Sequence, residues 1–299
     1  SDMAAVAATG ELVIDRGQGA HVYDEQGRRY LDASAGLWYC NVGHGRAALA
    51  DAAGAQMRRL ASYSAFGDLA TRPALDLAER LADMAPMDDA RVFLTSGGSD
   101  SVDTAVKLVR RYWAEEGQPD RSVIVTREHA YHGMHLAGTS LAGIEANKTG
   151  HGELDPAVVQ VPWDDADALE SLLGERDDIA AFFCEPIIGA GGVYAPPAGY
   201  LARVREICRR HGVLFVADEV ICGYGRAGAL FACERGALDP DVLLTAKGIQ
   251  VAMPSGYELF DKEEPLGSSQ FVQDVRLKRS LDGALARSII TMKGVDMAR

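Results

Sequence analysis

The sequence has little of what marks secreted, membrane-spanning or nucleic-acid-binding proteins. Its five cysteines are odd in number and never stand at CxxC spacing, so neither a disulfide framework nor a zinc site is expected. It has no apolar run long enough to span a bilayer. Its first residues lack a basic patch followed by an apolar core, so no signal peptide is expected and a cytoplasmic protein is favoured. Acidic residues outnumber basic ones by 43 to 30, which argues against nucleic acid or an anionic membrane as the main partner.

What is present is an ordinary globular composition in a chain of 299 residues, with 47% hydrophobic and 24% charged residues. That length suffices for one large domain or two smaller ones. Residues 11–32 alternate apolar and polar types between turn residues, which predicts a small antiparallel meander. Residues 34–45 are rich in glycine and aromatic residues and are expected to form a loop.

From about residue 46 the pattern changes, because helical stretches now alternate with short apolar runs. The helix candidates are residues 73–85, 100–115 and 198–211, and the strand candidates are residues 92–94, 122–126, 179–184, 213–217 and 241–244. Short apolar strands separated by helices predict βαβ units and a largely parallel sheet. Such sheets bind ligands beyond the carboxyl ends of their strands.

Polar residues follow three of these predicted strands. Glu185 and Asp218 each come directly after one, and Lys247 follows a third. A buried carboxylate needs a partner, and the pattern alone leaves open a protonated heterocyclic nitrogen, a metal ion or a structural role for Asp218. A lysine in such a place can be desolvated, which lowers its pKa and frees a neutral amine, although most lysines are solvated surface groups.

Two further segments have the composition of ligand-binding loops. Thr95–Ser99 lies between a strand and a helix, where the free N–H groups of the helix attract anions. The same segment could be a simple turn with Ser99 as a helix cap. Tyr131 follows a strand and could stack on a flat ligand or pack within its loop.

His44 and His129 are interpreted as hydrogen-bonded loop histidines.

Taken in chain order, these segments resemble the class III aminotransferases, a family of fold-type-I enzymes that depend on pyridoxal phosphate. The matching segments are residues 17–32, 35–45, 96–108, 131–133, 185–187, 218–226 and 245–248. Each motif alone is weak, but the ordered set is specific and covers roughly residues 11–249. The segment from Ala35 to Gly45 resembles the substrate-side loop of the family, especially that of the omega-transaminase branch.

The resemblance implies an α/β fold, with a mainly parallel sheet flanked by helices and an N-terminal meander that belongs to the small domain. Residues 1–45 would form the N-terminal small-domain segment and substrate loop. Residues 46–250 would form the domain that binds pyridoxal phosphate, and residues 251–299 an atypical C-terminal tail. Within the tail, residues 255–257 and 265–267 resemble parts of the family pattern in split form. Residues 268–299 match nothing in that pattern, although residues 271–287 have a helical pattern.

The resemblance also implies the site. It gives Lys247 the Schiff base with the cofactor and Asp218 the protonated pyridine nitrogen. The full set of cofactor-binding residues that it implies is Gly98, Ser99, Tyr131, His132, Glu185, Asp218, Val220 and Lys247. Among these, Gly98 and Ser99 would bind the phosphate, and Tyr131 and Val220 would cover the two faces of the ring. His132 and Glu185 would order the surroundings, Trp38 would line the substrate pocket, and no metal is expected.

The implied reaction moves an amino group from an omega-amino acid or amine to a keto acid such as pyruvate, in a homodimer. Ile221 replaces a glutamine of some branches and, with Trp38, favours the omega-amine:pyruvate type. Two alternatives remain open. A decarboxylase or aminomutase would use the same cofactor residues. A non-catalytic relative is favoured by the lack of the family's C-terminal small domain, and opposed by the presence of Asp218, Tyr131 and Lys247 together.

Overall fold

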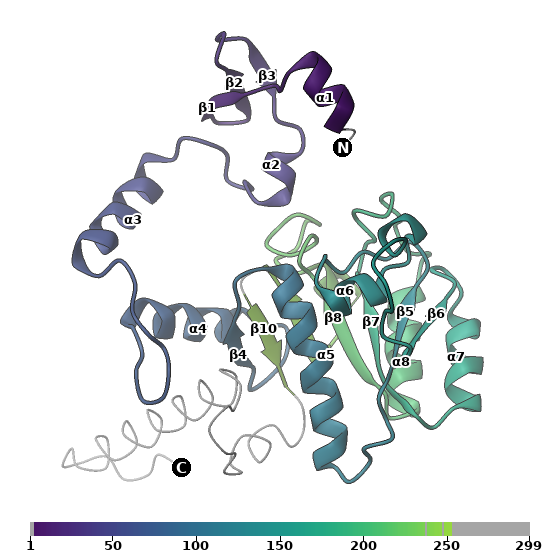
Figure 1. Ribbon diagram of the computed structural model, residues 1–299. Coiled ribbons are helices and arrows are strands. Elements are labelled where there is room, and N and C mark those ends of the chain that lie inside the picture. The colour runs from purple at the N-terminus through teal and green to yellow at the C-terminus, as the bar shows by residue number, and fades with distance from the viewer. Residues whose placement is uncertain (1–2, 237, 247, 253–299) are drawn as a thin grey trace, which may run out of the picture. The chain divides into compact units, whose positions relative to one another are not determined.

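In a computed structural model of the chain, residues 3–236, 238–246 and 248–252 are described. They fall into two compact units, the first ending at Tyr63 and the second beginning at Ser64 (Figure 1). Lys247 lies outside the described residues, as does the helix expected at residues 271–287. The predictions for these two places therefore stay predictions.

The first unit contains the expected antiparallel meander, with strand order β1-β2-β3. Its elements are α1 (Met3–Thr9), β1 (Ile14–Gln18), β2 (His21–Asp24), β3 (Arg29–Leu31), α2 (Ala35–Trp38) and α3 (Ala47–Arg59). Asp24 closes the turn between β2 and β3, because its carboxylate accepts hydrogen bonds from the backbone and guanidinium of Arg28 and from the Tyr30 hydroxyl. These bonds hold the pKa of Asp24 below its ordinary value against the opposing effect of desolvation.

The short element α2 is a left-handed turn rather than an ordinary helix. Ala35, Leu37 and Trp38 have φ values of 49°, 66° and 66°. A side chain in this region costs roughly 1–2 kcal/mol. The turn is held by Asp32, whose Oδ2 accepts a hydrogen bond of 2.8 Å from the backbone N–H of Gly36. The expected loop at residues 34–45 therefore contains a strained and well-bonded turn.

The second unit is built on a seven-stranded sheet with the order β4-β10-β9-β8-β7-β5-β6. Its strands are β4 (Arg91–Leu94), β5 (Val123–Arg127), β6 (Val158–Val161), β7 (Ile179–Cys184), β8 (Leu214–Asp218), β9 (Val242–Thr245) and β10 (Gly248–Val251). Strands β9, β8, β7, β5 and β6 run parallel to one another, whereas β10 is antiparallel to both β4 and β9. The prediction of a mainly parallel sheet is confirmed.

Helices cover both faces of this sheet (Figure 1). The helices of the second unit are α4 (Arg72–Met84), α5 (Gly98–Glu115), α6 (Leu136–Leu141), α7 (Ala166–Glu175) and α8 (Tyr200–Arg210), with 3-10 turns η1 (Glu145–Asn147) and η2 (Ala232–Gly236). Phe183 of β7 packs into one core with Val109 of α5. Its neighbour Phe182 packs into a second core with Val204 of α8. Both faces of β7 are thus buried, which explains its unbroken apolar sequence.

Candidate active site

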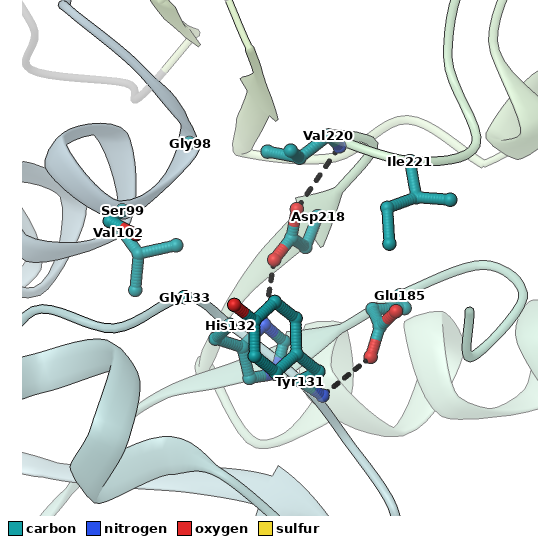
Figure 2. A pocket seen from close by; sticks show the side chains of 10 residues that line it. All are labelled: Gly98, Ser99, Val102, Tyr131, His132, Gly133, Glu185, Asp218, Val220 and Ile221. Carbon is teal, nitrogen blue, oxygen red and sulfur yellow. Dashed lines mark hydrogen bonds and ion pairs between the residues drawn. The ribbon is translucent and has the colours of Figure 1, made fainter. Parts of the chain in front are cut away.

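A pocket of about 200 Å³ lies at the carboxyl ends of the parallel strands, beside the N-terminus of α5 (Figure 2). It is lined by Gly98, Ser99, Val102, Tyr131, His132, Gly133, Glu185, Asp218, Val220 and Ile221. Every cofactor-binding residue predicted from the sequence, apart from Lys247, lies on this wall. The structure thus brings together segments that are more than a hundred residues apart in the chain.

Asp218 is the last residue of β8 and is only 4% exposed. Its Oδ2 lies 2.7 Å from Nδ1 of His132, and its Oδ1 accepts a hydrogen bond of 3.1 Å from the backbone N–H of Val220 (Figure 2). The His132 side chain is fully buried, and its Nε2 has no hydrogen-bond partner within the described part of the chain. A buried carboxylate fixed through both oxygens presents a defined negative charge to the pocket.

Glu185 follows β7 and anchors the loop that carries Tyr131. Its Oε1 accepts a hydrogen bond of 2.9 Å from the backbone N–H of Tyr131, and its Oε2 accepts one of 3.0 Å from Gly189. Burial raises the pKa of the Glu185 carboxyl, while the charge of His132 and these two N–H groups act in the opposite direction. Glu185 therefore fixes the backbone from which the Tyr131 ring projects (Figure 2).

The N-terminus of α5 meets the loop after β8. A Cβ added to Gly98 would lie 2.8 Å from Cγ1 of Val220, so only glycine allows this approach. The preceding Gly97 supplies no side-chain cap to α5. The first N–H groups of the helix are therefore available to a ligand anion, and the helix dipole favours one.

The loop from Tyr131 to Gly138 is fastened to α5 at two points. Ser99 Oγ accepts a hydrogen bond of 3.0 Å from the backbone N–H of Met134. One turn further along α5, Asp103 Oδ1 accepts bonds of 3.1 and 3.4 Å from the N–H groups of Ala137 and Gly138, at the start of α6. Sequence reasoning missed Asp103. The signal that could have found it is its i,i+4 spacing from Ser99, which places both side chains on one face of α5.

The chain neighbours of Lys247 are tied to the same helix. Ser101 Oγ donates a buried hydrogen bond of 3.1 Å to the carbonyl of Thr245, the last residue of β9. The Thr245 hydroxyl in turn donates to the carbonyl of Gly248 at 3.1 Å. Thr245 and Gly248 are thus fixed beside the start of α5. Trp38 belongs to the first unit, on its left-handed turn, and its role in substrate binding stays a prediction.

No helix among the described residues is long and apolar enough to cross a membrane. No group of three or more histidine, cysteine, aspartate or glutamate residues in the same part of the chain could hold a metal ion.

Comparison with known proteins identifies the family. The model of the class-III aminotransferases matches residues 3–265. The chain therefore belongs to the class-III aminotransferase family, whose members are pyridoxal-phosphate-dependent transferases. A second and shorter match, to the secretory protein of YscJ/FliF RBM domain, covers residues 258–299, which lie outside the described residues.

Curated relatives match most of this chain but only part of their own length. The putrescine–pyruvate aminotransferase of Pseudomonas aeruginosa is 39% identical over 268 residues, which cover 83% of this chain and 58% of the relative. Gamma aminobutyrate transaminase 3 of Solanum lycopersicum is 39% identical over 270 residues, with 82% and 51% covered. The chain thus spans little more than half the length of these relatives.

Solved structures of omega-transaminases share the fold. An (S)-enantioselective omega-transaminase from Thermomicrobium roseum superposes with a TM-score of 0.85 at 34% identity, covering 97% of this chain and 72% of that one. A transaminase from Virgibacillus gives a TM-score of 0.85 at 35% identity, covering 96% and 71%. The fold-type-I prediction is therefore confirmed.

The pocket suits pyridoxal phosphate. Within the described residues, the ion-pair partner of Asp218 is His132 alone. Each carboxylate oxygen can accept a second hydrogen bond, so Asp218 can also accept one from the N–H of a pyridinium ring. Gly98 and Ser99, at the N-terminus of α5, line the pocket, and the N–H groups at a helix N-terminus suit a phosphate. Tyr131 and Val220 supply an aromatic and an aliphatic surface for a flat ring.

Proposed function

We propose that this chain catalyses transamination, moving an amino group from an omega-amino acid or amine to a keto acid such as pyruvate. The observation that carries the proposal is the pocket in which Asp218, Tyr131 and the start of α5 converge at the ends of parallel strands. In this proposal Lys247 binds the cofactor covalently, and the protein acts as a cytoplasmic homodimer.

Pyridoxal phosphate, when bound, supplies an electron-withdrawing ring that stabilises negative charge on the substrate carbon. Asp218 holds the proton on the ring nitrogen, because a fixed and buried carboxylate favours the cation. His132 and the Val220 backbone keep that carboxylate in place. The remaining roles belong to the phosphate-binding start of α5 and to the surfaces that cover the ring.

Lys247 carries the proton step. When its amine is free, Lys247 would be the base that takes a proton from the substrate carbon. The described residues near Lys247 in the chain support this role. Thr245 is bonded to Ser101 of α5, the helix whose first residues line the pocket.

An apolar pocket wall favours the omega-amine type of substrate. Ile221 lines the pocket, and Gly189 leaves room for it, because a Cβ there would lie 3.0 Å from Ile221 Cδ1. An isoleucine offers no hydrogen bond to a polar ligand atom, unlike the glutamine of other branches. Two relatives are named for putrescine and gamma-aminobutyrate, both of which carry a terminal amine, in support of this substrate class.

The experiment is to add pyridoxal phosphate to the purified chain, record the visible spectrum, reduce with borohydride and map the labelled peptide. We expect a yellow protein with the label on Lys247, which Lys247→Ala abolishes. Lys107→Ala, at an exposed position of α5, is the matched control and should keep the label. A screen of amine donors against pyruvate then tests turnover.

Two results would contradict the proposal. A label on another lysine would remove Lys247 from its role. A labelled protein that transfers no amino group from any terminal amine to pyruvate would leave cofactor binding without transamination. Far-UV circular dichroism of both variants keeps loss of label distinct from loss of fold.

A further inference from the structure

The first unit contains a thiol, an imidazole and a carboxylate in series, separate from the pocket residues. Cys40 Sγ lies 3.4 Å from Nδ1 of His44. The other ring nitrogen of His44, Nε2, lies 2.8 Å from Oδ2 of Asp32. These three side chains, which we call the Cys40 triad, follow the order of a nucleophile, a base and a group that orients the base.

The hydrogen bonds determine which nitrogen of His44 carries the proton. An ionised aspartate only accepts hydrogen bonds, so Nε2 must donate to Asp32. In the neutral ring, Nδ1 then holds the lone pair and faces the Cys40 thiol. The imidazole is therefore oriented to take the thiol proton, and the carboxylate stabilises the imidazolium that results.

Backbone contacts fix the imidazole in this orientation. The N–H and carbonyl of His44 form a two-way bridge with Gly19, with bonds of 2.8 and 3.0 Å. A Cβ on Gly17 would lie 2.6 Å from the His44 ring, so the ring packs directly against the backbone of β1. The side chain of His44 is 23% exposed, so the ring is held from behind and is still open to solvent.

Asp32 is fixed as firmly as the ring. Its Oδ2 also accepts the Gly36 N–H at 2.8 Å, and its Oδ1 accepts the Ser34 hydroxyl at 3.1 Å. The hydrogen bond from His44 is the first of the causes that lower the pKa of Asp32 from its ordinary value. The carboxylate is therefore ionised at neutral pH and is available as the orienting group.

Cys40 differs from the other four cysteines of the chain. Cys184, Cys208, Cys222 and Cys233 are buried, whereas Cys40 is partly exposed. Burial raises the thiol pKa of all four buried residues, to about 11 in Cys184 and about 12 in Cys222. Those thiols are kept neutral and inaccessible, so a reagent in solution meets Cys40 first.

We infer that Cys40 is an activated thiol, at which the protein is covalently modified by small electrophiles and by hydroperoxides in particular. None of the three triad residues is among those that line the pocket. His44 takes the thiol proton, and the Cys40 thiolate attacks the terminal oxygen of the hydroperoxide. An S–O bond forms and the O–O bond breaks. The leaving alkoxide or hydroxide takes the proton from His44, giving a sulfenic acid and an alcohol or water.

The modification acts on a strained segment. The N–H of Cys40 donates to the carbonyl of Ala35 at 2.9 Å and so closes the left-handed turn that carries Trp38. An added oxygen on Sγ would replace the contact with His44. The turn would then lose one of the side-chain anchors that offset its unfavourable backbone geometry.

The test measures the rate at which Cys40 reacts in the folded chain of 299 residues. Hydrogen peroxide with dimedone traps sulfenic acid, and iodoacetamide is used in parallel. Peptide mapping by mass spectrometry assigns the label. We expect Cys40 to react about tenfold or more faster than glutathione at the same pH. His44→Gln should lower the rate on Cys40 by about tenfold, because glutamine fills the space and is no base.

His21→Gln in the same meander is the matched control and should leave the rate unchanged. If His44→Gln fails to fold, Asp32→Asn tests the inference in its place. The amide can reverse the tautomer of His44, so this variant should also slow the reaction of Cys40. The inference is overturned if Cys40 reacts no faster than glutathione. It is equally overturned if the folded variant at position 44 or 32 reacts at the wild-type rate.

Discussion

The Nδ1–H of His132 donates to Oδ2 of Asp218 across 2.7 Å, between two side chains that are almost wholly buried. Because the second oxygen of Asp218 accepts from the Val220 backbone, the carboxylate cannot rotate without breaking one of these bonds. Its charge is thus preset before any ligand arrives. A cation can therefore bind to the Asp218 carboxylate without any rearrangement of the protein.

Replacing this carboxylate should affect turnover more than binding. Asp218→Asn keeps the shape of the side chain and removes its charge, so the ring nitrogen loses the group that holds its proton. We expect kcat for transfer from an amine to pyruvate to fall on the order of a hundredfold or more, while borohydride labelling of the protein persists. Single-turnover spectra would measure the slowed step, and an unchanged kcat would exclude the role given to Asp218.

Two adjacent glycines at the start of α5 provide a matched pair. Gly98→Ala places a Cβ within 2.8 Å of Val220, a stiff β-branched side chain on the pocket wall. Gly97→Ala meets nothing within 4 Å, and its φ of 177° is extended backbone that alanine adopts. We expect the affinity for pyridoxal phosphate to fall about tenfold in the first variant only, as measured by spectroscopic titration. Equal cofactor affinities of the two variants would mean that the Val220 side chain shifts to make room for the added methyl group.

The link between Asp103 and α6 should matter to both stability and ligand binding. Asp103→Ala leaves the N–H groups of Ala137 and Gly138 without their acceptor, at a cost of about 1–2 kcal/mol in the free energy of unfolding. The Tyr131 loop would loosen, so cofactor affinity should fall as well. Asp103→Asn retains an acceptor oxygen and should restore most of both. Urea unfolding measures the free energy of unfolding of both variants, and titration measures their cofactor affinity. Equal losses in Asp103→Ala and Asp103→Asn would show that the charge of Asp103, and not its acceptor oxygen, stabilises the start of α6.

Buried thiols make the protein sensitive to alkali. Burial raises the pKa of Cys184 from 9.0 to about 11, so the folded chain keeps a proton that the unfolded chain releases. The contribution of this thiol to stability is complete below pH 9 and is lost as the pH rises toward about 11, by at most about 3 kcal/mol. Cys184→Ala should flatten this part of the curve of unfolding free energy against pH. A slope identical to that of the wild type would disprove the shift.

Sequence patterns predicted the parts of the fold in which local chemistry is unambiguous. The strand at residues 179–184 was predicted to the residue, because both of its faces are buried and its apolar run is unbroken. The helix predicted at residues 198–211 corresponds to α8, which is followed by Gly212 with a φ of 61°. Glycine marks such ends because it adopts this conformation without strain.

Other elements carry weaker signals. The sequence Val158–Val161 is short, and only its last residue is buried, so it resembles a loop as much as a strand. The pairing of β10 between β4 and β9 is a long-range relation that no local pattern contains. The left-handed turn at Ala35–Trp38 was predicted only as a loop, because three of its four residues are types that rarely adopt positive φ.

The candidate site was predictable as a set of residues but not as a network of bonds. Motif order pointed to Asp218, Tyr131 and Gly98 together, and they do line one pocket. That Glu185 would hold the Tyr131 backbone, and that Asp103 would hold the start of α6, depends on the geometry of loops rather than on residue type. The roles of these residues in cofactor chemistry remain predictions.

The pairing of β4 with β10 has a consequence for synthesis of the protein. In the described sheet, β4 is the first strand in chain order and is hydrogen-bonded to β10, the last. A ribosome adds roughly 5–20 residues per second, so the backbone of β4 waits on the order of ten seconds for its partner to emerge. Throughout that interval the nascent chain presents an unpaired strand edge, which is a template for association with other chains. We expect chaperones that recognise such edges to bind the nascent chain until residue 251 has left the exit tunnel.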